Sequence, residues 1–166
     1  MEEKWTMKDT INIIRTIIIL TVIMYFITTE VCHITQVQGE SMYPNIKDKE
    51  ILMLNCMNNK VNNIKRYDVV VFEAKNNNYY IKRVIGLPGE TIKVSAYEDA
   101  IYINGKKLTT DIYHLEDDIE YGTISTIKLA KDEYFVLGDN RNISDDSRSI
   151  GPIKSSSIDG VIINKR

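Results

Sequence analysis

The sequence contains few cysteines and few histidines, two of each among 166 residues. Two cysteines, Cys32 and Cys56, are too few for a scaffold held together by disulfides. The adjacent Cys32 and His33 do not have the spacing of metal ligands, and neither CxxC nor HxxxH occurs, so the sequence predicts no metal site. A strongly basic patch is also absent. The formal net charge is −2 and the short pair Lys65-Arg66 is typical of a solvated loop, so nucleic acid is not an expected partner.

The remaining composition is that of a globular chain. Hydrophobic residues make up 43% of the sequence and charged residues 27%, which are ordinary values. A length of 166 residues accommodates one domain comfortably but not two. We therefore expect a single folded domain.

Charge is absent from residues 16–29, which read TIIILTVIMYFITT. This run alone is shorter than the roughly 20 apolar residues that span a bilayer, but it can be extended back through residues 11–14 and forward to Val31. Arg15 would then lie about one turn inside the helix, from which its side chain can snorkel to the interface. A buried core helix and a cleavable signal peptide are the alternatives. The following TTEVCH offers no good small-x-small cleavage site, which disfavours the signal peptide.

The basic residues predict how this segment is oriented. Lys4, Lys8 and Arg15 lie before it or at its start, whereas the next Lys or Arg is Lys47. The positive-inside rule therefore places the N-terminus in the cytoplasm and makes this a single-pass protein of the cell membrane. The predicted parts are a cytoplasmic N-terminus with a transmembrane anchor, residues 1–31, and an extracytoplasmic domain, residues 32–166.

Past the anchor the sequence favours β-structure, because short runs rich in Val, Ile, Tyr and Phe recur between turn signals. The predicted strands are residues 51–54, 68–74, 79–87, 91–95, 101–103, 133–138 and 160–165. Asn104-Gly105 supplies the positive φ angles of a type I′ hairpin turn. The polar, acidic residues 109–130 are interpreted as a surface excursion. Together, these strands and turns predict a mainly β domain with an antiparallel, barrel-like sheet.

Ser41 stands in QGESMYPN, residues 38–45, which suits a shaped loop because strands tolerate Pro44 badly. If Ser41 is a nucleophile, another side chain must accept its proton. Histidine is the usual partner. However, His33 falls where the anchor leaves the membrane and His114 falls in the acidic excursion, so each is more readily a surface residue than a base.

Lysine is the other known partner for serine, and Lys82 is the candidate. It stands inside a predicted strand, with Tyr80 and Val84 two residues away on its own face. Burial and a nearby cation, Arg83, would lower the pKa of its amine. Bringing that pKa from about 10.4 to near 7 requires roughly 4–5 kcal/mol. An edge-strand lysine that points to solvent and blocks aggregation fits the same stretch equally well.

Four stretches occur in order after the single anchor, GESMYP, YDVVVF, YYIKRVIGLPGE and GDNRNISDDSRSIGPI. In this order they resemble the type I signal peptidases, or leader peptidases, which are membrane-bound enzymes that remove signal peptides from exported proteins. The resemblance covers nearly all of the chain, and the small size and single anchor are similar to the Gram-positive form. It implies that Ser41 is the nucleophile and that Lys82 is the general base.

The resemblance implies further roles by position. Met42 and Ile81 match residues that shape the substrate cleft, and Ser144 matches a hydroxyl that orients the lysine amine. The positions that match supporting residues are Arg83, Gly138, Asp139, Asn140, Arg141, Asp146 and Arg148. Asp146 and Arg148 are expected to pair with each other or with Arg83. The backbone N–H of Ser41 is expected to donate to the oxyanion of the transition state.

Two positions depart from the family pattern. Some relatives place a serine, whose hydroxyl is a second oxyanion donor, where this chain has Gly39. That donor would here come from the backbone or be absent, as in Gram-positive relatives. Asn45 stands where a threonine is more usual, and we expect this change to affect the turn more than the chemistry. Without the other stretches, the charged residues near Asp145 would also fit a solvated loop of ion pairs.

The sequence therefore predicts an anchored serine endopeptidase with a Ser41–Lys82 dyad and no cofactor. Its expected substrates are preproteins in which an extended segment, with small residues at −1 and −3, adds as a strand beside the cleft. Membrane lipid and the protein-export machinery are expected nearby. A narrower Ser-Lys maturation peptidase of the pilin or conjugation type would share the dyad, and a non-catalytic surface β module would share the fold. The self-cleaving repressors carry a DNA-binding domain where this chain has an anchor.

Overall fold

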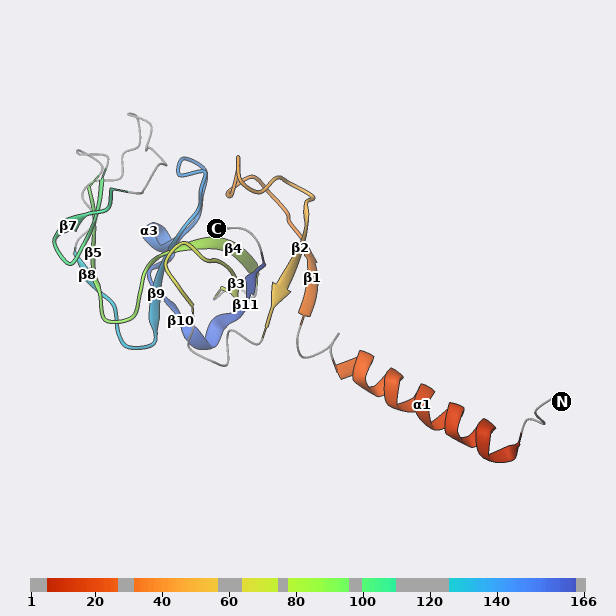
Figure 1. Ribbon diagram of the computed structural model, residues 1–166. Helices are drawn as coiled ribbons and strands as arrows, with labels where there is room; N and C mark the ends of the chain where they lie inside the picture. Colours follow the sequence, from red (N-terminus) through yellow and green to blue (C-terminus); the bar gives the residue numbers. More distant parts are fainter. Residues whose placement is uncertain are drawn as a thin grey trace.

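The computed structural model describes residues 6–26, 32–56, 64–74, 78–95, 100–109 and 126–163. One long helix, α1 (Met7–Phe26), extends away from a β domain (Figure 1). The helix has 20 residues, is apolar enough to cross a membrane, and has no buried residue. It therefore does not have the packing of a core helix. Its start is capped by Thr6 and Asp9, since the Thr6 N–H donates to Asp9 Oδ2 at 2.9 Å.

A seven-stranded antiparallel sheet forms the larger part of the domain, in the order β1-β2-β11-β3-β4-β9-β10. Its strands are β1 (Cys32–Gln36), β2 (Ile51–Asn55), β3 (Val69–Glu73), β4 (Tyr79–Gly86), β9 (Glu133–Leu137), β10 (Ile153–Lys154) and β11 (Ile158–Ile162). The short helix α3 (Ser147–Ile150) precedes β10, and the 3-10 helix η2 (Ser155–Ser157) follows it.

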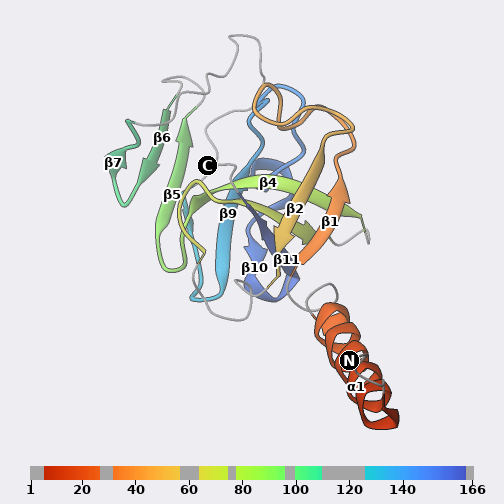
Figure 2. The ribbon, with the colours of Figure 1, turned by 45° about the vertical axis from the view of Figure 1, so that its right-hand side comes forward.

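A second, four-stranded sheet lies on the opposite side of the domain from β1 and β2 (Figures 1 and 2). In the order β7-β6-β5-β8, its strands are β7 (Lys106–Lys107), β6 (Ala100–Ile103), β5 (Thr91–Ser95) and β8 (Ile127–Lys128). The hairpin of β6 and β7 turns at Asn104 and Gly105, whose φ angles are 51° and 79°. Both angles are positive, as predicted for a type I′ turn.

Packing on both faces explains the continuous apolar run of β3. Val70 and Phe72 belong to one buried cluster, whereas Val69 and Val71 belong to another. Alternate residues of a strand face opposite sides, so two clusters require that both faces be covered. A third cluster joins β4 and β9 to β5 and β6. The site described below lies on β4, which contacts all three clusters.

The mainly antiparallel β fold and the seven predicted strands are confirmed, with small shifts at the strand ends. The sequence does not predict β1, whose residues CHITQ include no apolar run. The interpretation of residues 109–130 as a surface excursion is wrong for Ile127–Lys128, which form β8 and pair with β5. Residues 110–125, including His114, lie outside the described residues.

Candidate active site

Ser41 lies in a turn between β1 and β2 that is anchored in the core. Met42 is only 1% exposed and Ile46 is fully buried, and the Ile46 N–H donates to the Met42 carbonyl oxygen at 2.9 Å. These two apolar residues hold residues 41–46, here called the nucleophile turn, and leave Ser41 lining a cleft. Met42 is therefore a core residue, although it lies in a turn.

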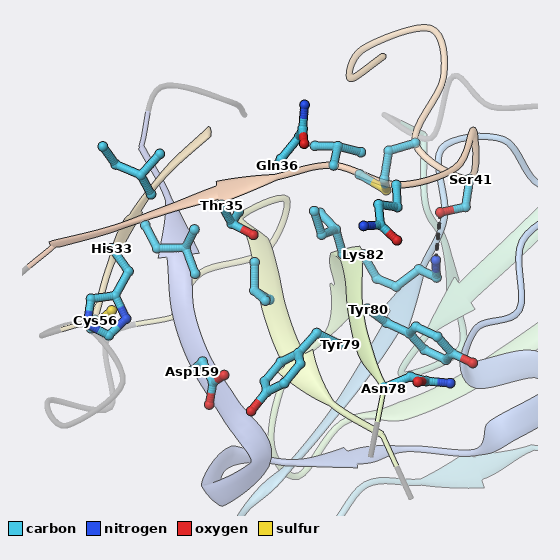
Figure 3. A pocket seen from close by; sticks show the side chains of 17 residues that line it. His33, Thr35, Gln36, Ser41, Cys56, Asn78, Tyr79, Tyr80, Lys82 and Asp159 are labelled. Carbon is cyan, nitrogen blue, oxygen red and sulfur yellow. Dashed lines mark hydrogen bonds between the residues drawn. The ribbon is translucent and has the colours of Figure 1, made fainter. Parts of the chain in front are cut away.

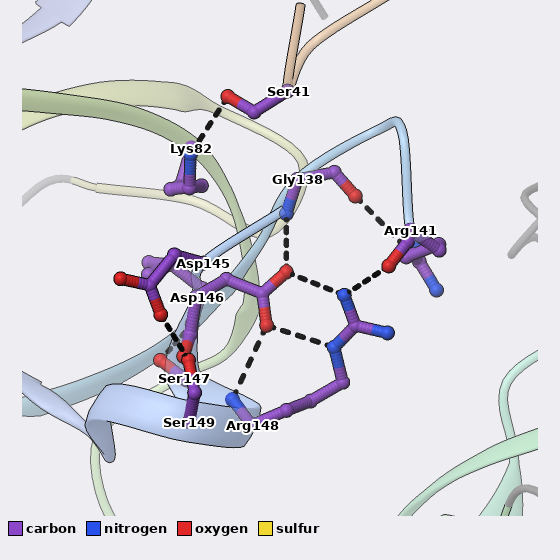
Figure 4. Close-up of polar contacts among 10 residues, drawn as sticks. Ser41, Lys82, Gly138, Arg141, Asp145, Asp146, Ser147, Arg148 and Ser149 are labelled. Carbon is purple, nitrogen blue, oxygen red and sulfur yellow. Dashed lines mark hydrogen bonds and ion pairs between the residues drawn. The ribbon is translucent and has the colours of Figure 1, made fainter. Parts of the chain in front are cut away.

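Lys82 comes from β4, opposite Val70 of β3, and is only 4% exposed. Its Nζ donates a hydrogen bond to Ser41 Oγ at 2.8 Å (Figures 3 and 4). The ring of Tyr80, two residues away on the same strand, has its centroid 5.4 Å from Nζ. The alternative of an edge-strand lysine pointing to solvent is therefore wrong.

Burial lowers the pKa of Lys82 to about 8, because removal of water disfavours the ammonium form. The carboxylates of Asp146, Asp145 and Asp139 oppose this shift, and the guanidinium of Arg148 adds to it. Arg148, rather than the neighbouring Arg83 suggested by the sequence, is thus the cation that lowers this pKa. A lysine with a pKa of about 8 has an appreciable neutral fraction near neutral pH, as a general base requires.

Arg83, the residue after the lysine, forms a buried ion pair with Asp139. Its Nε donates to Asp139 Oδ1 at 2.7 Å and its Nη2 donates to Oδ2 at 2.6 Å. Arg83 Nη1 also donates to the carbonyl oxygen of Tyr67 at 2.9 Å. The two charged side chains are 6% and 1% exposed, so each charge depends on the other for compensation. The pair fixes β4 beside the loop that follows β9.

Asp146 and Arg148 form a second buried pair (Figure 4). Arg148 Nε donates to Asp146 Oδ1 at 2.8 Å and Nη2 donates to Oδ2 at 2.9 Å. Asp146 Oδ2 also accepts from the Gly138 N–H at 3.0 Å, and Arg148 Nη2 also donates to the carbonyl oxygen of Arg141 at 2.6 Å. The pair therefore holds both ends of residues 138–141, here called the site loop. The side chains of Arg148 and Asp146 are 4% and 0% exposed, so this pair does not belong to a solvated loop of ion pairs.

The backbone of the site loop touches the backbone of Ser41. The Asn140 N–H donates to the Ser41 carbonyl oxygen at 2.9 Å. Gly138 passes so close that a Cβ at this position would lie 2.6 Å from the Ser41 carbonyl oxygen and 2.1 Å from Ser144 Oγ. A residue with a side chain would therefore push the loop away from Ser41, which explains the glycine.

Ser144 does not make the hydrogen bond to Lys82 that the sequence leads us to expect. Its Oγ is buried and has no hydrogen-bond partner within the described part of the chain. The amine of Lys82 is instead directed at Ser41 Oγ. The Ser144 hydroxyl nevertheless lies beside Gly138, as does the carbonyl group of Ser41, so Ser144 is close to the backbone of Ser41.

A cleft of about 1070 Å³ runs from Ser41 and Lys82 at one end to His33, Cys56 and Asp159 at the other (Figure 3). His33 therefore lies far along the cleft from Ser41 and is not placed to accept its proton. His114 lies outside the described residues.

Met42 and Ile81, the two residues predicted to shape the cleft, both line it. Sequence reasoning missed Tyr79, Tyr80 and Asp159 as lining residues. Tyr79 and Tyr80 directly precede Ile81 and Lys82 in strand β4, so the strand position of the lysine could have indicated them. Nothing in the local sequence of Asp159 distinguishes it from a surface carboxylate.

Asn45 links the nucleophile turn to the Arg83–Asp139 pair. Its Nδ2 donates to Asp139 Oδ2 at 2.9 Å, and the same oxygen accepts from Arg83 Nη2. One carboxylate thus contacts both the residue that follows Lys82 and the turn that carries Ser41. Sequence reasoning noted Asn45 only as a departure from the family pattern, and its partner could not be identified without the fold.

We expect Asn45→Ala to lower kcat roughly tenfold with a smaller change in KM, because small displacements of reacting groups are costly in rate. The lost hydrogen bond is to a charged acceptor, which is worth about 1.5–3 kcal/mol. Lys47→Ala is the matched control, since Lys47 is an exposed residue of the same segment. Steady-state kinetics on a peptide substrate provide the measurement. Equal kcat values for the two variants would contradict a positioning role for Asn45.

A serine hydroxyl in contact with a buried lysine amine is an arrangement that is also found in serine peptidases in which lysine replaces histidine. Comparison with known proteins gives the family. The sequence profile of peptidase family S26, described as signal peptidase, matches residues 10–164. The chain belongs to this family and is a serine peptidase, as the sequence predicts.

Individual relatives are similar over most of the chain. Signal peptidase I V of Bacillus subtilis (strain 168) is 38% identical over 138 residues, which cover 76% of this chain and 81% of that protein. Signal peptidase IB of Staphylococcus aureus (strain Mu50) is 35% identical over an alignment of 170 positions, covering 93% and 88%. A 2.27 Å crystal structure of a signal peptidase I from Enterococcus faecalis V583 is 36% identical, with a TM-score of 0.50, and covers 59% of this chain and 95% of that one.

Proposed function

We propose that this chain removes signal peptides from exported preproteins, with Ser41 as the nucleophile and Lys82 as the general base. The observation that supports this most is the 2.8 Å hydrogen bond between Lys82 Nζ and Ser41 Oγ, made by a lysine that is 4% exposed. A solvated lysine stays protonated to about pH 10 and could not act as a base. The names of the family and of its relatives, all signal peptidases, support the substrate class.

The contact supports a two-stage reaction. The neutral amine of Lys82 accepts the hydroxyl proton as Ser41 Oγ bonds to the carbonyl carbon of the scissile peptide. Lys82 then gives this proton to the leaving amine, the C–N bond breaks, and an ester to Ser41 remains. A water molecule that loses its proton to Lys82 attacks this ester, and the proton returns to Ser41 Oγ as the acid product leaves.

The negative charge on the carbonyl oxygen needs hydrogen-bond donors in each stage. We propose the backbone N–H of Ser41 as one donor. Gly39 has no side chain to offer as a second, and its own N–H donates to Asp48 Oδ1 at 2.9 Å. The stabilisation of the oxyanion therefore rests on the nucleophile turn itself.

Ser144 is proposed to hold the lysine during the reaction rather than before it. When Ser41 Oγ is bonded to the substrate, the ammonium of Lys82 needs a new acceptor. The buried Ser144 Oγ, which has no hydrogen-bond partner among the described residues, can provide one. The ion pairs Arg83–Asp139 and Asp146–Arg148 support the site by fixing β4 and the site loop.

The free strand edges support binding of an extended substrate. Among the described strands, β1 pairs with β2 alone, and residues 79–82 of β4 pair with β3 but not with β9, whose pairing begins at Arg83. The cleft lies between these two edges (Figure 3). A substrate segment can add there as a strand. Met42 and Ile81, which line the cleft with Ser41, would leave room for only small side chains at −1 and −3.

The anchor is part of the proposal. Residues 1–31 would form the cytoplasmic N-terminus and the transmembrane helix, and residues 32–166 the extracytoplasmic peptidase domain. The apolar, exposed helix α1 and the basic residues before it support this orientation in the cell membrane. Membrane lipid and the export machinery would then be close to the cleft, where signal peptides emerge.

The test is cleavage of a purified precursor that carries a signal peptide, with the cut located by mass spectrometry. We expect the detergent-solubilised full chain to cut after a small residue at −1 with another at −3, and Ser41→Ala to lose all cleavage. Ser156→Ala, an exposed serine in η2, should retain wild-type turnover. Persistent cleavage by Ser41→Ala, or a cut that follows large side chains, would overturn the proposal.

A further inference from the structure

The end of the cleft away from Ser41 carries charged groups that have no part in the proposed selection of small residues at −1 and −3. Asp159 of β11 and Tyr79 of β4 line this end with His33 of β1, and the Tyr79 hydroxyl and the Asp159 carboxylate point toward each other (Figure 3). Asp159 is exposed. Among the described residues that line the cleft, no lysine or arginine occurs besides Lys82, which lies at the opposite end.

Two carboxylates, those of Asp159 and Glu73, act on the groups at this end. Desolvation and the carboxylate of Glu73 raise the pKa of Asp159, and His33 opposes this rise. Asp159 and Glu73 together raise the pKa of Tyr79. The titratable groups around this end are therefore His33, Glu73, Tyr79 and Asp159, together with the thiol of Cys56. Since the two carboxylates act on Tyr79 through their charge, they would also attract a cation at this end.

The length of β1 indicates which part of a substrate would reach this end. Residues 33–38 line the cleft from the His33 end to the segment just before Ser41. At about 3.3 Å per residue, five steps of extended chain span roughly 16 Å. A substrate strand alongside residues 33–38, with its scissile bond at the Ser41 end of the cleft, therefore reaches the His33 end, where Asp159 lies, about five residues before the cut.

The anchor indicates the direction of that strand. Only residues 27–31 separate the end of α1 from the start of β1, so the His33 end of the cleft is the end nearer to the anchor. The apolar segment of a signal peptide precedes the cleavage site and lies in the bilayer. The residues before the cut would therefore occupy the His33 end, and the mature protein would leave past Ser41.

We propose that Asp159 makes the anchor-side end of the cleft a subsite for a lysine or arginine side chain about five residues before the cleavage site. Asp159 is thus a specificity-determining residue, and this inference rests on the proposed function. Because the carboxylate is exposed, water and salt screen its attraction, and the resulting preference is modest.

The experiment uses peptides that are identical except for Lys, Gln or Glu at position −5, with parallel sets varied at −4 and −6. All carry Ala at −1 and −3, and kcat/KM is measured with the full chain in detergent. We expect the order Lys, Gln, Glu in wild type, spanning roughly tenfold at low salt and less at high salt. Asp159→Asn should flatten this order and Asp159→Lys should invert it. Asp132→Lys, at an exposed position that does not line the cleft, should keep the wild-type order.

Each result of this experiment either supports or overturns the proposed subsite. An unchanged order in Asp159→Lys, or equal rates for the three peptides at all three positions in wild type, would overturn the subsite and leave the proposed function intact. Loss of the order in Asp132→Lys would also overturn it, because the effect would then come from net charge. Failure of wild type to cut any peptide would overturn the proposed function, and the subsite with it.

Discussion

Lys82→Arg should abolish cleavage as completely as Ser41→Ala. Arginine keeps the positive charge and much of the length of lysine, but its guanidinium stays protonated to about pH 12 and cannot accept the Ser41 proton. The wild-type rate should rise with pH through the pKa of Lys82, which burial lowers from 10.5 to about 8. The sign follows from the base role, because only the neutral amine, present above that pKa, is active. The measurement is kcat/KM against pH for both proteins.

Two controls separate loss of the base from loss of the fold. Lys82→Met should also be inactive, yet at pH 7 it should be more stable than wild type, because burying a protonated lysine whose pKa falls from 10.5 to about 8 costs about 3 kcal/mol. That penalty is complete below about pH 8 and disappears as the pH rises to 10.5, since the unfolded chain alone binds the proton in this interval.

The double variant His33→Ala/His114→Ala should retain activity. Substantial activity in Lys82→Arg, or its loss in the histidine variant, would require a different base.

Asp146→Ala should lower both the free energy of unfolding and the activity. Asp146 is fully buried and accepts from Arg148 and from the Gly138 N–H, so its removal leaves a buried guanidinium uncompensated and frees the site loop. Breaking a buried pair in this way costs about 3–5 kcal/mol, which is a large fraction of the stability of an ordinary domain. Urea unfolding measures the first effect, and turnover at a temperature where the variant is folded measures the second.

Asp145→Ala is the matched control for this experiment. The neighbouring carboxylate is exposed, and its side-chain hydrogen bond is with the hydroxyl of Ser149. Its removal should change the free energy of unfolding by less than about 0.5 kcal/mol. If Asp145→Ala and Asp146→Ala are destabilised equally, the buried pair does not support the site loop in the way described.

The sequence by itself determined the features that depend on nearby residues. The period of apolar residues identified the strands, Asn104-Gly105 identified a turn that needs two positive φ angles, and the long uncharged run identified an exposed apolar helix. The order of four stretches identified the family, and with it the expectation that Ser41 acts with Lys82. The strand, turn and helix signals can each be read within a short window, because strand and helix periods and turn conformations are local properties of the backbone.

Only the tertiary structure decided the environment of those residues. Lys82 could have pointed to solvent or been buried, and the choice depends on β3, on Tyr80 and on the nucleophile turn, which come from separate parts of the chain. The pairing of Arg83 with Asp139 and the position of Asp159 along the cleft likewise depend on segments that are distant in sequence and meet only in the folded domain. Desolvation and ion pairing depend on every group within a few ångströms, and most of these groups are distant in sequence, so no local pattern could specify them.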